Sequence, residues 1–495
     1  MHWATFGAAL LFSLQAVANN WPYFTAASQP FRPPRLQIST GGNKPDPGYI
    51  FFGPRGNEAE GTAALIYDLN GDLVYQGPGE VTANFKVQRL YNQDVITFWA
   101  GDMMLLGYGY GTVHILDNTY TEIYTVQLQD SFMTPDGQPR DSYIDLHESH
   151  ITDRNTLLVT AYNVTQHDLT AVGGTPDMYM LDAKFYEIDI ATNEIVHSWS
   201  ALDHPDEIPL DKSKQGLGEG FGTVDNPWDT YHINAVELMD EGYMISMRHY
   251  WSGYYVHNNG SILWQLSGAS GEGDFDIDDA AVFSWQHDIR IFNQTEEGLV
   301  MDLFNNANTP TETVADSTGL SLAVDLVNRK VTPLRVLSDS DDVIHSVSQG
   351  SYQLNEASQH VVLGYGSISK IKEFDENNRA VLTVQFGVDG EVASYRGYKC
   401  EWKATPSWKP SVVVQQATPD TADVYMSWNG ATEHDNWAVM SMPSPDSMER
   451  TLLVSQKRTG FETIAHLTEV QSPGYLQAVA RKGEVPLGTS EVVVL

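Results

Sequence analysis

The chain has 495 residues, of which 42 % are hydrophobic and 19 % charged, a composition that supports a large buried core and excludes an intrinsically disordered protein. Its 28 Lys and Arg against 64 Asp and Glu give a formal net charge of −36, which opposes binding to nucleic acids and to anionic membrane surfaces. Cys400 is the only cysteine, so an intramolecular disulfide and cysteine-based metal centres are also excluded.

The N-terminus carries the features of a secretory signal peptide. Residues 1–18 contain an apolar run that is followed by Ala16-Val17-Ala18, the small-x-small pattern that signal peptidase accepts. We therefore predict cleavage after residue 18 and a secreted protein. Three acceptor sequons fit a glycosylated eukaryotic secretory protein; their asparagines are Asn163, Asn259 and Asn293. No later apolar stretch reaches the ~18 residues that span a bilayer, so we expect no membrane span.

Residues 19–56 are rich in proline and glycine. They contain PFRPP, GGNKPDPG and GPRG, which favour an extended arm over a helix, and we expect this arm to run along the body of the protein. After it, short β-branched and aromatic runs alternate with Asn, Asp and Gly, and a period of 3.6 residues is almost absent. The sequence therefore predicts an all-β fold.

One hairpin pattern occurs six times in residues 57–408. Each copy is an alternating strand, a polar turn and a second strand, as in LIYDLNGDLVYQG from Leu65. The central positions of the six copies are Asp68, Asp117, Asp189, His257, Asp325 and Asp375. Six units of about one four-stranded blade each predict a six-bladed β-propeller over residues 57–408. A β-sandwich is the alternative, but it would not repeat one hairpin six times.

A second repeated unit lies between the hairpins and contains the candidate catalytic residues. When its copies are aligned on the apolar strand that follows, one position holds His147, His232, His287 and Gln349. Equivalent positions on the innermost strands of a propeller converge on the central axis, so we expect these side chains to share one funnel. A single histidine is more often structural than catalytic, but three at equivalent positions favour a functional cluster.

The sequence pattern changes after residue 408, where the predicted propeller ends. Residues 409–495 contain seven short strands separated by turn residues, which predict a small fibronectin- or immunoglobulin-like β-sandwich. This segment shows no catalytic pattern, and we expect His434, in the turn of a hairpin, to be a surface residue.

The blocks WDTYHINAVE, SWQHDIRIFN, LFNNAN and HSVSQGSYQL resemble the secreted fungal arylsulfotransferase-like family, relatives of the bacterial aryl-sulfate sulfotransferases. The resemblance runs from Tyr49 to the C-terminus. It implies a six-bladed propeller with a fibronectin-like C-terminal domain, and the transfer of sulfate between phenols through a sulfated histidine without the cofactor PAPS. It also implies that His232 and His287 are active-site histidines.

Sulfate transfer through an enzyme nucleophile needs a neutral imidazole, cations or N–H donors for the sulfonate oxygens, and an acid for the departing phenolate. His287 is the preferred nucleophile in this interpretation, His232 the proton donor, and His147 an assisting group. The substrate-binding candidates are Arg248, Arg290, Arg396, Asn234, Asn306 and Gln349. Strand alternation places Arg290 and His287 on opposite faces unless a bulge intervenes.

Other uses of the same residues stay open. His147 and His150 with Glu148 or Asp288 could bind zinc or a calcium-like ion, but their spacing is not diagnostic, and we predict neither a metal nor a cofactor. The expected partner is a small aromatic or phenolic substrate. Aromatic residues that could stack on it are Tyr231, Trp251, Trp285 and Tyr365. The alternatives are a secondary-metabolite cyclase, isomerase or hydrolase, and a non-catalytic ligand-binding propeller.

Overall fold

The computed structural model describes residues 21–56, 59–468 and 474–495, and the predicted signal peptide lies outside them. The described residues form 34 strands and five short 3-10 helices, which confirms the all-β prediction. None of these helices has the length and apolar character that crossing a membrane requires.

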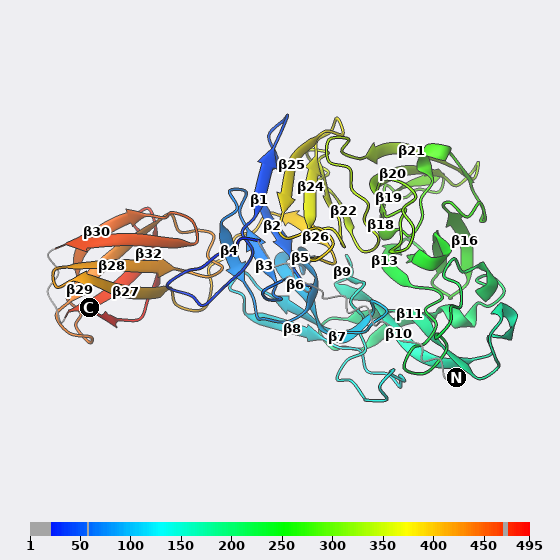
Figure 1. Ribbon diagram of the computed structural model, residues 1–495, viewed down its shortest axis with the longest axis horizontal. Helices are drawn as coiled ribbons and strands as arrows, with labels where there is room; N and C mark the ends of the chain where they lie inside the picture. The colour runs from blue at the N-terminus through cyan, green and yellow to red at the C-terminus, as the bar shows by residue number, and fades with distance from the viewer. Residues whose placement is uncertain (1–20, 57–58, 469–473) are drawn as a thin grey trace, which may run out of the picture.

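Six sheets of four or five strands, mainly antiparallel, occupy residues 37–400 (Figure 1). The first three are β26 (Gly397–Cys400), β2 (Tyr49–Phe52), β3 (Leu65–Tyr67) and β4 (Leu73–Gln76); β5 (Thr82–Leu90), β6 (Gln93–Met103), β7 (Gly109–Leu116) and β8 (Glu122–Val126); and β9 (Ser149–Ile151), β10 (Thr156–His167), β11 (Met178–Asp189) and β12 (Ile195–Ser200).

The other three sheets follow in chain order. They are β13 (Ile233–Met239), β14 (Gly242–Met247), β15 (Ser252–His257) and β16 (Ile262–Ser267); β18 (His287–Phe292), β19 (Gly298–Asn305), β20 (Thr318–Asp325), β21 (Lys330–Leu337) and β17 (Asp276–Ile277); and β22 (Ser351–Leu354), β23 (Val361–Gly364), β24 (Lys370–Phe374), β25 (Ala380–Gln385) and β1 (Gln37–Thr40).

The six copies of the hairpin pattern fall in six different sheets, at the turns β3–β4, β7–β8, β11–β12, β15–β16, β20–β21 and β24–β25. At every copy the central side chain accepts a hydrogen bond from the backbone N–H two residues later. The bonds are Asn70 to Asp68, Thr119 to Asp117, Ala191 to Asp189, Asn259 to His257, Val327 to Asp325 and Asn377 to Asp375. This local bond fixes the turn, which explains why the central position recurs.

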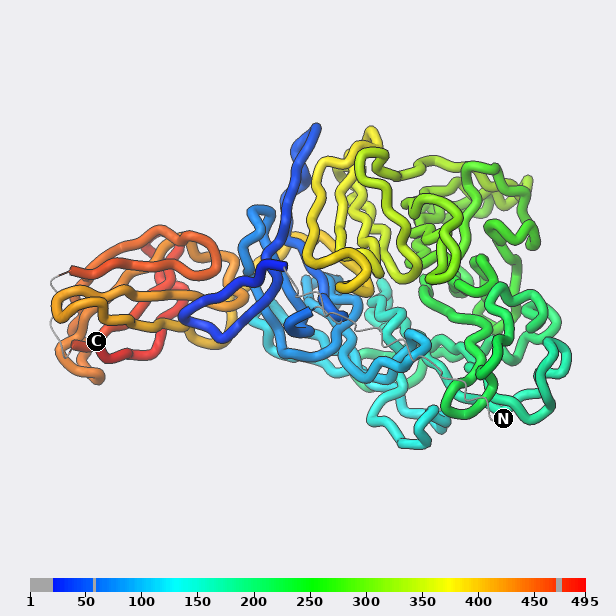
Figure 2. Tube along the Cα trace, viewed as in Figure 1, coloured from blue at the N-terminus to red at the C-terminus, as the bar shows by residue number. Residues whose placement is uncertain are grey.

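The proline- and glycine-rich segment differs from the expected arm because it supplies two strands. β2 lies between β26 and β3, and β1 pairs with β25, so strands from both ends of this region share sheets. Ile50, Phe51 and Phe52 are completely buried, so this short apolar run is part of the core. In Figure 2 the trace passes from blue through cyan and green to yellow strands that lie beside blue ones again.

The C-terminal residues form two antiparallel sheets beside the first six (Figure 1). Their strands are β27 (Ser411–Thr418), β28 (Thr421–Ser427) and β31 (Glu462–Thr468) in one sheet, and β29 (Asn436–Met442), β30 (Thr451–Lys457), β32 (Tyr475–Lys482), β33 (Val485–Thr489) and β34 (Val493–Val494) in the other. The two sheets share one hydrophobic cluster, which contains Trp428 and Trp437.

His434 corrects one sequence expectation. It is buried, 4 % exposed, and its ring contacts those of Trp428 and Trp437, so the prediction of a surface residue was wrong. A turn residue is usually exposed, but this turn folds back over the core of the C-terminal sheets.

Three strands from three of the six sheets, β5, β13 and β18, are bulged near the end where they begin. Register shifts occur between Ala83 and Lys86 in β5, Ile233 and Ala235 in β13, and His287 and Arg290 in β18. Such a bulge lets neighbouring residues of one strand point to the same side.

Candidate active site

The structure gathers the histidines that the sequence placed at equivalent positions. His147 and His232 precede β9 and β13, and His287 begins β18. The three side chains are buried. The ring centroids of His147 and His232 are 4.6 Å apart, and the ring of Tyr395 contacts those of His147 and His287 at 5.4 and 6.4 Å. Gln349 joins them, because its backbone N–H donates to His287 Nε2 at 3.1 Å.

His147 and His232 are oriented in the same way. Nδ1 of His147 lies 2.6 Å from Asp145 Oδ2, and Nδ1 of His232 lies 2.5 Å from Asp229 Oδ2. A carboxylate at Nδ1 fixes the ring and leaves Nε2 pointing away from the carboxylate. Within the described residues, no group hydrogen-bonds to Nε2 of either ring, so both nitrogens are available for chemistry.

His287 is held differently. Its Nδ1 lies 2.6 Å from Asn306 Oδ1, an acceptor, so Nδ1 carries the proton and Nε2 accepts the Gln349 N–H. Asn306 in turn donates to the Gln349 carbonyl at 2.9 Å. Both ring nitrogens of His287 are therefore engaged, and its Nε2 must give up a hydrogen bond before it can react.

Arg248 is the cation nearest to this cluster. Its Nη1 lies 2.9 Å from His249 Nε2, and its guanidinium lies over the ring of Trp285 at 5.0 Å. Burial lowers the pKa of His232, His249 and His287 well below the ordinary value, and the charge of Arg248 adds to the effect for each. The three imidazoles are therefore neutral at pH 7.

Arg290 and Arg396 belong to a separate buried ionic network. The bulge in β18 turns Arg290 into the interior, but its Nη2 meets Glu148 Oε2 at 2.9 Å and Asp288 Oδ1 at 2.8 Å. Nη1 of Arg396 lies 3.1 Å from Glu148 Oε1 and 3.3 Å from Asp288 Oδ1. Burial raises the pKa of Glu148, but Arg290 and Arg396 outweigh it and hold that pKa below its usual range.

Of the remaining candidates from the sequence, some contact the histidine cluster and others make only structural contacts elsewhere. Asn234 Nδ2 donates to the Gln286 carbonyl at 2.7 Å, a structural bond between neighbouring sheets. Trp285 contacts His249 at 5.8 Å and Trp251 at 5.4 Å, so these two indoles border the cluster. Tyr231 stacks on Tyr250, and Tyr365 packs against Phe304, away from the histidines.

Among the residues that the structure describes, two groups of side chains have the donor atoms for a metal ion: Asp229 with His232 and His249, and Asp46 with His360 and Glu373. In the first group the Arg248 guanidinium lies against His249 Nε2, and its positive charge opposes a second cation. In the second group the Lys399 ammonium contacts Glu373. In the alternative set that the sequence left open, Glu148 and Asp288 are paired with arginines and so are not free to bind a metal with the histidines.

Sequence reasoning missed four residues of this site, namely Asp145, Asp229, His249 and Tyr395. Two of them had a signal, since an aspartate precedes His147 by two residues and His232 by three. His249 follows Arg248 directly. Tyr395 had no signal, because only the fold brings it to the histidines.

The sequon asparagines differ in exposure. Asn259 and Asn293 are exposed, whereas Asn163 is partly buried in β10 and its Oδ1 accepts the Met133 N–H at 2.8 Å. Asn259 and Asn293 are thus the more accessible of the three glycosylation candidates.

Several solved structures share features of this fold at low identity. They include a protein of unknown function from Bacteroides caccae (9 % identity, TM-score 0.37, 72 % of this chain and 99 % of that one) and an α-L-arabinofuranosidase from Fusarium graminearum bound to an iminosugar inhibitor (8 %, 0.31, 77 % and 96 %). An α-L-arabinanase from Penicillium chrysogenum bound to arabinobiose is a third (9 %, 0.31, 70 % and 88 %). These TM-scores carry no argument about function.

No curated protein matches the chain. The family model for arylsulfotransferase (ASST) matches residues 86–387, which is more than half of the chain and includes His147, His232, His287 and Gln349. The chain therefore belongs to the arylsulfotransferase (ASST) family.

Proposed function

We propose that the protein is a secreted arylsulfotransferase-like enzyme that moves sulfate between small phenolic molecules through a histidine, without PAPS. The observation that carries this proposal is the pair His147 and His232, each with a carboxylate at Nδ1 and a free Nε2. Membership of the ASST family supports the reaction class. The neutral state of His232 supports its role as nucleophile, because only the unprotonated nitrogen can attack sulfur.

The proposed fold is a six-bladed propeller followed by a fibronectin-like sandwich. Six successive sheets with one hairpin pattern support the blades, and the shared cluster of the last two sheets supports the sandwich. In this arrangement the histidines lie at the central axis, where one polar group from each of several blades can meet a single substrate.

The proposed transfer has two steps. His232 Nε2 attacks the sulfur of an aryl sulfate, so that an N–S bond forms and the S–O bond to the phenol breaks. In this step His147 starts protonated on both ring nitrogens, and the departing phenolate oxygen takes the proton from its Nε2. The acceptor phenol then returns a proton to His147 as its oxygen attacks the same sulfur, which breaks the N–S bond and restores His232. Sulfate passes between the phenols with no other reactant.

Donors for the sulfonate oxygens lie beside the pair. Arg248 is the nearest cation, and its buried Nε has no hydrogen-bond partner among the residues of known placement. The buried hydroxyl of Tyr395 also lacks a partner among them, and its ring contacts His147. Unpaired buried donors are costly, so an incoming anion gains from both.

This assignment differs from the sequence-based roles, in which His287 was the nucleophile. The two hydrogen bonds that occupy the His287 ring favour a structural task for it, which is to hold Gln349 and Asn306 in place. The test must therefore separate His232 from His287.

The test incubates the mature protein with 4-nitrophenyl sulfate and without PAPS, then combines intact mass, peptide mapping and phenol release. We expect a mass gain of about 80 Da, one SO3 unit, on the peptide that contains His232. His232→Gln should lose the adduct, and the exposed His345→Gln is the matched control. An adduct on His287 would transfer the nucleophile role to that residue.

Absence of both adduct and phenol release would overturn the sulfate proposal. The same buried histidines would then favour a non-sulfate enzyme or a ligand-binding protein, and metabolite screening would be the next step. Secretion has a separate test, which is N-terminal sequencing of protein from the culture medium of a eukaryotic host, with an expected start after residue 18. A glycosidase-sensitive mass at Asn259 or Asn293 would support passage through the secretory pathway.

A further inference from the structure

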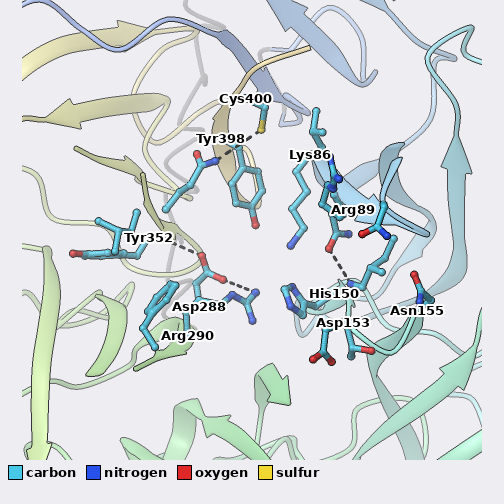
Figure 3. A pocket seen from close by; sticks show the side chains of 18 of the residues that line it. Lys86, Arg89, His150, Asp153, Asn155, Asp288, Arg290, Tyr352, Tyr398 and Cys400 are labelled. Atoms are coloured by element: carbon cyan, nitrogen blue, oxygen red, sulfur yellow. Dashed lines mark hydrogen bonds and ion pairs between the residues drawn. The ribbon is translucent and has the colours of Figure 1, made fainter. Parts of the chain in front are cut away.

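A cavity lies at the other end of the strands that carry the histidines. Its volume is about 650 Å³, and its walls come from β5, β9, β18, β22 and β26. The histidine cluster lies where these strands begin, whereas the cavity takes residues further along them. Lining residues that matter here are Lys86, His150, Arg290, Tyr352, Tyr398 and Cys400 (Figure 3).

The ionic network separates this cavity from the histidines. Glu148 follows His147 in the chain and is completely buried, and it binds Arg290 and Arg396 from two other sheets. Asp288, one residue after His287, binds the same two arginines. The two carboxylates balance the two guanidinium groups, and Glu237 is a third carboxylate in the network, with Oε2 3.2 Å from Arg290 Nη1. A ligand in the cavity is therefore distinct from one at the histidines.

Lys86 is the unusual residue of the cavity. Its side chain extends toward Tyr398 and His150 (Figure 3), and only 8 % of the residue is exposed. Within the described residues its ammonium has neither a hydrogen bond nor an ion pair; it lies 5.4 Å from the centre of the Tyr398 ring and feels the charges of Glu148 and Arg290 at longer range. A buried lysine without a partner is rare, because burying an unpaired charge costs free energy.

Tyr398 offers a second free donor. Its hydroxyl oxygen accepts from Arg396 Nη1 at 3.4 Å, and no acceptor among the described residues takes its own proton. Nδ1 of the nearby His150 is buried and has no hydrogen-bond partner among the residues that the structure describes, while its Nε2 lies 3.6 Å from Glu237 Oε1. Burial lowers the pKa of Lys86 to about 8, with Arg290 adding to the effect, so the amine is largely protonated at neutral pH.

We propose that this cavity is a second binding site, for a small organic anion whose carboxylate meets the Lys86 ammonium and the Tyr398 hydroxyl. The walls suit an apolar body behind the charge, since Phe292, Tyr352 and Leu354 line the cavity. The anion supplies the hydrogen-bond acceptor that both donors lack, and its negative charge compensates the buried positive charge of the Lys86 ammonium.

Calorimetric titration with benzoate and hexanoate tests this site, with benzamide as the neutral probe of the same shape as benzoate. We expect at least one carboxylate to bind with a Kd of about 1 mM or tighter, and benzamide to bind at least about tenfold more weakly. Lys86→Met keeps the buried stem and removes the charge, and it should weaken carboxylate binding by about tenfold or more.

Tyr398→Phe is a second variant that removes only the hydroxyl and should weaken binding by a smaller factor. Arg89→Met is the matched control, because Arg89 lies on the rim of the same cavity but is exposed and paired with Asp94. It should bind as the parent does. Bound benzoate should also protect Lys86, but not Lys330, from acetylation by acetic anhydride in peptide mapping.

Two results would overturn the proposal. One is the absence of binding heat from both carboxylates up to about 10 mM. The other is carboxylate affinity that is unchanged in both Lys86→Met and Tyr398→Phe, which would place the anion elsewhere.

Discussion

Nδ1 of His232 lies 2.5 Å from Oδ2 of Asp229, which precedes it by three residues. The backbone of His232 has a positive φ of 57°, a conformation that non-glycine residues adopt at a cost, so the turn holds the imidazole against the carboxylate at the expense of local strain. Strain of this kind persists only where surrounding contacts impose it. Here Arg248 donates its backbone N–H to the His232 carbonyl at 3.0 Å and helps to fix the turn.

Asp229→Asn should therefore reduce sulfate transfer while it leaves the fold intact. The asparagine fills the same space, but it no longer provides the carboxylate that keeps the proton on Nδ1, so Nε2 is less available. We expect kcat/KM to fall by roughly 100-fold or more, measured as phenol release from 4-nitrophenyl sulfate. Asp240→Asn, an exposed change in the turn after β13, is the control. Unchanged kcat/KM in Asp229→Asn would contradict the role of the pair.

Removal of metal ions should not affect transfer. The group Asp229, His232 and His249 has metal-binding atoms, but the Arg248 guanidinium lies 2.9 Å from His249 Nε2. We expect full activity after dialysis against a chelator and less than one equivalent of bound metal by elemental analysis. Activity that is lost in the chelator and restored by zinc would show that Arg248 moves and that a metal is part of the site.

Much of the fold was predictable because the repeat depends on local bonds. Asp68 and Asp375 lie far apart in the chain, yet each accepts the N–H two residues later, and such a bond needs only the right residue at the right spacing. The strand β2 was harder to predict. Its partner β26 lies at the other end of the region, and no short-range pattern reports such a pairing.

The histidine cluster was predictable only in part. Alignment of the repeats placed His147, His232 and His287 together, but it carried no information on which ring nitrogen is free. Tyr395 and Lys86 were missed because the alignment of repeats carries no information on packing. Their importance comes from what they lack, a hydrogen-bond partner, and that is a property of three-dimensional packing rather than of sequence.

Glu148→Gln should destabilise the protein strongly. The carboxylate is completely buried between Arg290 and Arg396, and its removal leaves two guanidinium groups with less compensating charge. Breaking a buried pair of this kind costs about 3–5 kcal/mol, and urea unfolding followed by fluorescence would measure it.

The control for this change is Asp136→Asn, which breaks the exposed pair with Arg140. This control substitution should lower the free energy of unfolding by less than about 1 kcal/mol. Equal effects of the two substitutions would mean that the buried network does not anchor the interior of the six sheets.

The stability of the C-terminal sheets should depend on pH through His434. Burial lowers the pKa of this imidazole to about 3, with the charge of Arg458 adding to the effect, and neither ring nitrogen has a hydrogen-bond partner in the described part of the chain. The unfolded chain takes up the proton near its ordinary pKa of about 6.5, whereas the folded protein does not. The free energy of unfolding is therefore complete above about pH 6.5 and falls as the pH drops toward 3.

His434→Phe removes this titration and keeps a ring between Trp428 and Trp437. When the pH is lowered from 8 to 5, the free energy of unfolding of the variant should fall by about 2 kcal/mol less than that of the parent. Denaturant unfolding at both pH values, followed by tryptophan fluorescence, would measure the gain. His466→Phe is the control, because that imidazole is 76 % exposed, and its difference from the parent should be similar at both pH values. If His434→Phe and the parent lost stability in parallel between pH 8 and pH 5, the buried imidazole would not be the group that responds to pH.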